Sequence, residues 1–256
     1  MREGGEPGLK DALQRGGLGA FWFALGSPGL VELALFAAPD VIVIDLQHGL
    51  WSRDALEAAL GQIPSTISTI ARLSEGSAGQ IGQALDAGAT SVLVPLVENA
   101  AEAAACVQAA HYPPLGRRSG GGVRPLGRGF ASYVTEARAR TTVGVMIETV
   151  TGVEQARAIA ATPDLDFVFI GTGDLALSLG CFPDTDQRHE AACRHILDAC
   201  RAARLPCGIF TSGPEDAARR LREGYAMAIT ANDIGLVAAG FAAVSTAFTG
   251  LMKGTA

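Results

Sequence analysis

Short apolar runs alternate with helical segments eight times along the chain, and this alternation most constrains its fold. The runs are rich in β-branched and aromatic residues, and the segments between them show helical patterns. Such alternation is typical of β–α units around a parallel sheet. The expected strands are GAFWFAL from Gly19, VIVIDL from Val41, TISTIARL from Thr66, SVLVPLV from Ser91, TVGVMIE from Thr142, DFVFIG from Asp166, PCGIFTS from Pro206 and AMAITA from Ala226.

Eight β–α units in 256 residues match a (β/α)8 barrel, or TIM barrel, for which ~250 residues is typical. We therefore expect one domain over residues 1–256, with the barrel core in residues 18–234. A doubly wound open sheet is the alternative. Ser52 precedes the helical pattern RDALEAAL, where its hydroxyl can cap the helix. Residues 112–129 are rich in Pro, Gly and Arg, which predicts a long irregular loop that is functional or mobile.

Composition excludes several classes of protein. Acidic residues outnumber basic ones by 26 to 20 and no Lys/Arg-rich run occurs, so nucleic-acid binding is not expected. The five cysteines include no C-x-x-C pair, which disfavours a disulfide framework or a structural zinc site. His189, Cys193 and Cys200 fall at helical spacing, and core packing is their expected role. The first ten residues lack the apolar stretch of a signal peptide, so we expect a cytoplasmic protein.

Residues 234–252 form the only membrane-like run, because they carry no charge. Gly, Ser and Thr interrupt this run. We therefore expect a helix that is buried or packs on another subunit, and no membrane partner.

Polar side chains lie at the ends of four expected strands, where a barrel collects its chemistry. They are Asp45, Gln47 and His48 at the second strand, Arg72 at the third, Glu148 at the fifth and Asp174 at the sixth. Because the carboxyl ends of all barrel strands meet at one mouth, we expect these side chains to lie close together.

The residue types at this mouth suit enolate chemistry. Glu148 and Asp174 can hold one divalent cation through oxygen, with Mg²⁺ or Mn²⁺ as the natural occupant. Such an ion polarises a carbonyl, and a 2-oxo acid offers it both a carboxylate and a keto oxygen. Arg72 supplies positive charge for the oxygen that becomes negative as an enolate forms. His48 suits acid–base transfer near neutral pH.

Each of these residues also has a structural alternative. Either carboxylate alone can be a helix cap or an ion-pair partner. Arg72 can simply pair with Asp45 or Asp86, and His48 can be a core histidine bonded to a backbone carbonyl. Their shared position at one end of the expected strands favours the functional interpretation.

The segment GTGDLA from Gly171 has the G-x-G-x-x-A spacing of a dinucleotide-binding turn. Asp174 would place negative charge inside the phosphate-binding turn, and no acidic residue ends a strand ~20 residues later. We therefore reject a dinucleotide site.

Six motifs follow one another along residues 19–233. They are VIVIDLQHG from Val41, IARL before Ser74, QALDAGATSVLVPLVENAAEA from Gln83, YPPLGRRSGG from Tyr112, MIETVTGVEQARAIA from Met146 and DFVFIGTGDLALSLG from Asp166. Their order and spacing resemble those of the HpcH/HpaI aldolase family, the class II pyruvate aldolases that cleave or form 4-hydroxy-2-oxo acids.

The resemblance implies a role for each polar residue at the mouth. His48 is then the catalytic histidine, working with Asp45, and Arg72 binds and stabilises the pyruvate enolate. Glu148 and Asp174 are the implied ligands of a divalent metal ion, Mg²⁺, Mn²⁺ or Co²⁺. The implied substrates are a small-molecule 2-oxo acid and an aldehyde.

The resemblance also implies an assembly. Family members are typically hexamers that exchange the C-terminal helix, so we expect a homo-oligomer, a hexamer or a trimer, with residues 234–252 on a neighbouring subunit. Asp86 resembles an aspartate that the family contributes to the site across a subunit boundary, and we include it among the catalytic residues.

The sequence departs from the family pattern near the expected substrate. Gln47 stands where many relatives carry Glu, and Met146 stands where a glutamine often contacts pyruvate. Thr172 and Ala176 replace a common Pro and Ser, and a methionine cannot donate a hydrogen bond. The expected substrate-binding residues are Arg72, Met146, Gly171, Thr172 and Gly173.

A metal-dependent retro-aldol cleavage is the leading hypothesis. In it, His48 takes the 4-hydroxyl proton through Asp45 or a water, and the C3–C4 bond breaks. Lys10 and Lys253, the only lysines, lie outside the expected strands, which excludes a Schiff-base mechanism.

Two other functions are alternatives. One is an acyl-CoA lyase of the citryl- or malyl-CoA type, with Arg117 and Arg118 at the CoA phosphates. The other is a barrel that has lost catalysis and binds a small acid. In the aldolase hypothesis, residues 112–129 are the expected determinant of the aldehyde partner.

Overall fold

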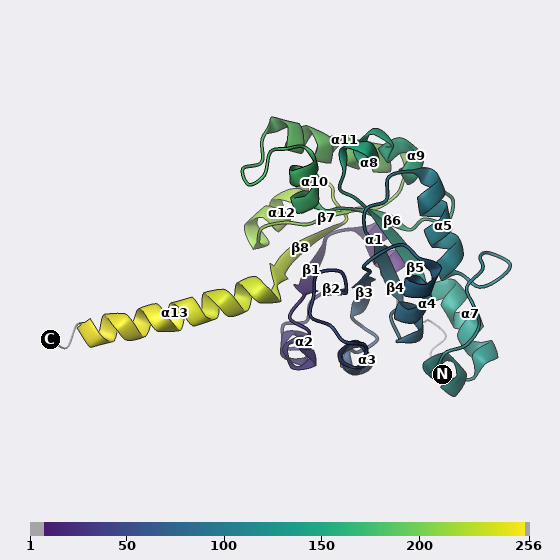
Figure 1. Cartoon of the computed structure of the whole chain (residues 1–256), viewed down its shortest axis with the longest axis horizontal. Helices are drawn as coiled ribbons and strands as arrows, with labels where there is room; N and C mark the ends of the chain where they lie inside the picture. Colours follow the sequence, from purple (N-terminus) through teal and green to yellow (C-terminus); the bar gives the residue numbers. More distant parts are fainter. Residues whose placement is uncertain (1–7, 254–256) are drawn as a thin grey trace.

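The computed structural model describes residues 8–253. Its centre is a closed barrel of eight parallel strands in sequence order, with β8 beside β1 (Figure 1). The strands are β1 (Leu18–Phe23), β2 (Val41–Asp45), β3 (Ser68–Arg72), β4 (Ser91–Val94), β5 (Thr142–Ile147), β6 (Phe167–Ile170), β7 (Cys207–Ile209) and β8 (Met227–Asn232). All eight expected strands and the TIM-barrel architecture are confirmed, and the closed sheet excludes the doubly wound alternative.

Most of the helices surround the barrel (Figure 1). The helices are α1 (Leu9–Arg15), α2 (Pro28–Leu35), α3 (Arg53–Gln62), α4 (Ala78–Asp86), α5 (Ala100–Ala110), α6 (Val123–Gly127), α7 (Phe130–Arg140), α8 (Val150–Glu154), α9 (Ala156–Ala160), α10 (Thr172–Ser178), α11 (Gln187–Ala203), α12 (Pro214–Arg222) and α13 (Asp233–Lys253). The expected cap of α3 is confirmed, since Ser52 Oγ accepts a 3.2 Å hydrogen bond from the backbone N–H of Ala55.

The strands are buried on both faces, which explains why they are continuous apolar runs. In β2, Val41 and Val43 join the cluster inside the barrel, whereas Ile42 and Ile44 join the cluster that includes α2 and α3 side chains. The α1 side chains also belong to the inner cluster, next to the first residues of β1 and β8. Helix α1 therefore covers the amino end of the barrel, and the carboxyl end is left for ligands.

Residues 112–129 are the expected irregular loop only in part. They include α6, and they follow α5, which runs from the carboxyl end of the barrel back to the amino end. Arg118 in this segment is buried and forms a 2.8 Å ion pair with Asp86. This corrects two expectations for a single chain, because the segment does not border the mouth and Arg118 is not free for CoA phosphates.

The C-terminal helix α13 extends away from the barrel (Figure 1). Asp233, its first residue, is its only buried one, and its carboxylate accepts hydrogen bonds of 2.9 and 2.8 Å from the backbone N–H groups of Ala24 and Leu25. Of the two expected placements, burial within its own chain is therefore wrong, and packing on another subunit stays a prediction. By length and composition alone α13 could also cross a membrane, but a single helix of this kind is weak evidence for a membrane span.

Candidate active site

The ends of β2 and β3 carry a buried ion pair. Asp45 and Arg72 are register partners on the two strands and are 3% and 5% exposed. Arg72 Nε donates to Asp45 Oδ1 at 2.8 Å, and Nη2 donates to Oδ2 at 2.7 Å. Because a guanidinium presents its donors in a rigid fork, this two-point contact fixes its plane.

Further donors surround the Asp45 carboxylate. It accepts hydrogen bonds from Trp22 Nε1 at 3.1 Å and from the backbone N–H groups of Gln47 and His48 at 3.0 and 3.1 Å. Burial by itself would raise the pKa of Asp45, but Arg72 and these hydrogen bonds lower it below its ordinary value. Asp45 therefore stays ionised.

The contact between Asp45 and His48 runs through the His48 backbone. The ring of His48 is not part of it, so the expected proton path through Asp45 is not formed in this structure. The five hydrogen bonds to Asp45 explain the difference, because they commit both of its oxygens to positioning Arg72 and the residues after β2. His48 itself is exposed at the mouth, where a substrate can reach its ring.

Arg72 keeps donors for a ligand. Its Nη1 donates to Gln47 Oε1, and its guanidinium lies over the Trp22 ring, 5.3 Å from the centroid. Contacts within residues 8–253 use three of its five N–H groups, which leaves two for an anionic oxygen. The sequence did not predict that Trp22, in an apolar strand, donates its indole N–H to Asp45. Gln47 was considered only as a departure from the family pattern and not as a partner of Arg72.

Glu148, which follows β5, is a buried carboxylate with one unsatisfied oxygen. It is 1% exposed, and Oε1 accepts a 2.8 Å hydrogen bond from the backbone N–H of Leu96. Its Oε2 has no hydrogen-bond partner among the described residues. Burial raises the pKa of Glu148 to about 7; the Leu96 hydrogen bond opposes this rise and the Asp174 carboxylate adds to it. A buried carboxylate oxygen without a donor is a position suited to a cation.

The turn after β6 brings Asp174 towards Glu148. Asp174 stands in the first turn of α10 and interacts electrostatically with Glu148. Gly171 lies against Glu148 Oε2, and a Cβ at this position would collide with that oxygen. Thr172 Oγ1 donates a 3.2 Å hydrogen bond to the Phe210 carbonyl after β7. Glycine at position 171 therefore lets the turn pass close to the carboxylate.

This pair of carboxylates fits a hard cation. Within the described part of the chain, no group of three His, Cys, Asp or Glu residues could enclose a metal ion. Mg²⁺ is commonly held by one or two carboxylates and completes its shell with waters and substrate oxygens. Glu148 and Asp174 match that donor set.

Two predicted site residues have other contacts in the single chain. Met146 is 3% exposed and belongs to the cluster that fills the barrel, next to Gly171. It therefore supports the turn by packing. Asp86 ends α4 at the amino end of the barrel, paired with Arg118, so a single chain does not bring it to the mouth. Any role of Asp86 in a site requires a second subunit.

Known proteins resemble this chain in sequence and fold. A profile described as HpcH/HpaI aldolase/citrate lyase matches residues 19–239. A 4-hydroxy-2-oxovalerate aldolase of Novosphingobium aromaticivorans is 38% identical over 67% of this chain and 67% of the relative. A hydroxypyruvate/pyruvate aldolase of Paraburkholderia phytofirmans is 32% identical over 83% of this chain and 86% of the relative. The crystal structure of an HpcH/HpaI aldolase/citrate lyase family protein from Burkholderia cenocepacia J2315 has a TM-score of 0.86 and 31% identity, covering 93% and 98% of the two chains.

Proposed function

This chain belongs to the HpcH/HpaI aldolase/citrate lyase family and is an aldolase, a carbon–carbon lyase, and we propose that it cleaves or forms 4-hydroxy-2-oxo acids with a divalent metal ion. One observation carries the proposal. Glu148 buries a carboxylate with an unsatisfied oxygen close to Asp174, at the end of the barrel where Arg72 keeps unused donors.

Glu148 and Asp174 would hold the ion, which we propose to be Mg²⁺, Mn²⁺ or Co²⁺. When bound, it would supply Lewis-acid polarisation of the keto oxygen of the substrate. The turn Gly171, Thr172 and Gly173 would contact the 2-oxo acid on the side of β6.

Each side chain at the mouth then has a separate role in cleavage of the C3–C4 bond. His48 takes the proton of the 4-hydroxyl, directly or through a water, and that oxygen forms the aldehyde carbonyl as the C3–C4 bond breaks. The electron pair of this bond moves into the pyruvate enolate, and a proton that returns to C3 of the enolate gives pyruvate. Arg72 places its two unused N–H groups on the enolate oxygen, and Asp45 and Trp22 hold the guanidinium in position.

We also propose that the enzyme is a cytoplasmic homo-oligomer, a hexamer or a trimer. An apolar stripe on α13 supports the oligomer. Its members recur at alternating steps of three and four residues, a spacing that places side chains on one face of a helix that packs against another. They are Ile234, Val237, Phe241, Val244, Phe248 and Leu251. A neighbouring subunit would cover this stripe and could bring its Asp86 to the site.

Pyruvate release, coupled to lactate dehydrogenase, tests the function. The assay uses a panel of 4-hydroxy-2-oxo acids with EDTA, Mg²⁺ or Mn²⁺. Release that EDTA abolishes and metal restores is the expected result. If the folded oligomer releases no pyruvate with any metal, the proposal is wrong. Turnover of citryl- or malyl-CoA would then favour the acyl-CoA lyase, and binding of a small acid without turnover would favour the inactive barrel.

A further inference from the structure

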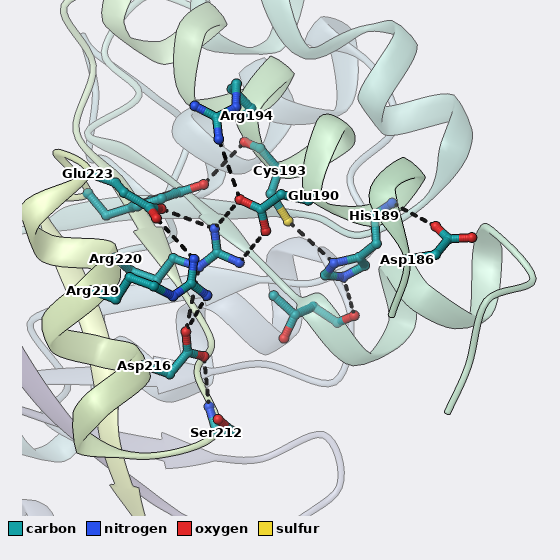
Figure 2. A network of polar contacts seen from close by, with 12 residues as sticks. Asp186, His189, Glu190, Cys193, Arg194, Ser212, Asp216, Arg219, Arg220 and Glu223 are labelled. Atoms are coloured by element: carbon teal, nitrogen blue, oxygen red, sulfur yellow. Dashed lines mark hydrogen bonds and ion pairs between the residues drawn. The ribbon is translucent and has the colours of Figure 1, made fainter. Parts of the chain in front are cut away.

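His189 lies outside the proposed site but reaches its backbone. It stands near the start of α11 and is 4% exposed. Its Nε2 lies 3.0 Å from the carbonyl oxygen of Thr172, and its Nδ1 lies 3.9 Å from Cys193 Sγ (Figure 2). A carbonyl oxygen only accepts, so Nε2 carries the proton and donates it. Burial raises the pKa of the Cys193 thiol to about 12, which keeps it protonated and able to donate to Nδ1.

Helix α11, which carries the His189 imidazole, is held firmly in place. Asp186 caps the helix, with Oδ1 accepting from the backbone N–H groups of Arg188 and His189 at 2.8 and 3.3 Å. Arg220 joins α11 to α12 by donating to both oxygens of Glu190 at 2.7 Å (Figure 2). The ring of His189 is therefore held at both nitrogens, by Cys193 of the same helix at Nδ1 and by the Thr172 carbonyl at Nε2.

Few polar contacts hold the start of the turn that His189 contacts, whereas Leu175 and Ala176 anchor the rest of α10 by packing. Thr172 begins α10, and Asp174 follows two residues later. A cavity of about 800 Å³ borders Thr172, Gly173, His189 and Phe210, so this side of the turn is not covered by packed side chains. The His189 and Phe210 contacts are the polar links that hold Thr172 there. No described residue donates a hydrogen bond to the Asp174 carboxylate, so its place depends on the backbone of this turn.

We propose that His189 is a positioning residue, whose Nε2–H holds the Thr172 carbonyl and thereby sets where α10 presents Asp174 to Glu148. The inference rests on the proposed function, in which these two carboxylates bind the metal ion. Partners behind the first ligands of a metal ion typically contribute about 10–100-fold in metal affinity. The helical spacing predicted core packing for His189 and Cys193. In addition to packing, His189 would hold the Thr172 carbonyl.

The test compares His189→Leu with three variants. His189→Gln can restore a donor, because the Gln amide nitrogen can occupy the place of Nε2. His195→Leu removes an exposed histidine of the same helix, and Cys200→Ala opens a cavity in α11 without touching His189. Should His189→Leu not fold, His189→Asn, whose amide is too short to reach Thr172, replaces it.

Two measurements decide the question. Calorimetric titration of the metal-free protein with Mn²⁺ should show about 10–100-fold weaker binding for His189→Leu, substantial recovery for His189→Gln and no change for His195→Leu or Cys200→Ala. Hydrogen–deuterium exchange should show lost protection in His189→Leu alone, at Leu175, whose backbone N–H donates to the Gly171 carbonyl, and at the residues that follow it in α10. Unchanged Mn²⁺ affinity and unchanged protection would overturn the proposal.

The two proposals can fail separately. If wild type binds no Mn²⁺ and releases no pyruvate, the proposed function fails. The hydrogen–deuterium exchange then still reports whether His189 holds the turn, and unchanged protection rejects that claim.

Discussion

The guanidinium of Arg72 meets Asp45 at two points, with Nε 2.8 Å from Oδ1 and Nη2 2.7 Å from Oδ2. This contact orients the guanidinium before a substrate arrives, and it leaves N–H groups on the far side for an oxyanion. Preorganised donors of this kind act where charge develops in the transition state.

Replacing Arg72 by Lys should lower kcat/KM for pyruvate release by about 100-fold or more, because an ammonium cannot contact both Asp45 oxygens and an enolate in a fixed plane. Steady-state assays measure the loss, and the control is Arg188→Lys, an exposed arginine on α11. A loss below about threefold in Arg72→Lys would show that the two-point contact does not serve catalysis.

The lowered pKa of Asp45 predicts a pH dependence of stability. The ionised Asp45 carboxylate contributes fully to the free energy of unfolding above the ordinary carboxyl pKa of about 3.9. This contribution is lost as the pH falls through the lower pKa of the folded state. The difference in free energy of unfolding between wild type and Asp45→Asn should therefore be large at pH 7 and shrink below about pH 4. Urea unfolding measures it, with the exposed Asp184→Asn as control. A difference that does not depend on pH would contradict the assignment.

Glu148→Gln should remove the response of the protein to metal. Because the buried Oε2 has no donor, the neutral variant should be at least as stable as wild type in EDTA. Mn²⁺ at 100 times its dissociation constant should stabilise wild type by about 2.7 kcal/mol and leave Glu148→Gln unchanged. Thermal unfolding with and without Mn²⁺ measures both effects. Glu154→Gln, an exposed glutamate on α8, should behave as wild type. An equal Mn²⁺ response in Glu148→Gln would exclude Glu148 as a ligand.

Gly171→Ala should abolish pyruvate release while the barrel still folds. The added Cβ would occupy the place of Glu148 Oε2, so the carboxylate or the turn must move. Activity and Mn²⁺ titration measure the result. Gly79→Ala in α4 adds a methyl group where no atom lies within 4 Å and should leave both unchanged. Full activity in Gly171→Ala would show that the turn tolerates the displacement.

Phe241→Asp should reduce the size of the oligomer, because it places a charge in the apolar stripe of α13, where Phe241 is 74% exposed in the single chain. Thr246→Asp introduces the same charge on the opposite face of the helix and should keep the wild-type size. Analytical ultracentrifugation measures both. An unchanged sedimentation coefficient for Phe241→Asp would remove α13 from the subunit interface.

Local patterns in the sequence were enough to predict the barrel and the side chains at its mouth. Each strand is a short apolar run, and a residue at the carboxyl end of one barrel strand, such as Arg72 or Glu148, shares an end of the barrel with the others in any closed parallel sheet. Position in the chain and alternation of strand and helix therefore determined that these groups lie at one end.

Contacts between distant segments required the tertiary structure. The register of β2 and β3 pairs Arg72 with Asp45, and the direction of α4 and α5 moves Asp86 and Arg118 to the amino end. The packing of α11 beside α10 brings His189 to Thr172. None of these contacts has a local signature, because each depends on where two separately formed elements meet in space.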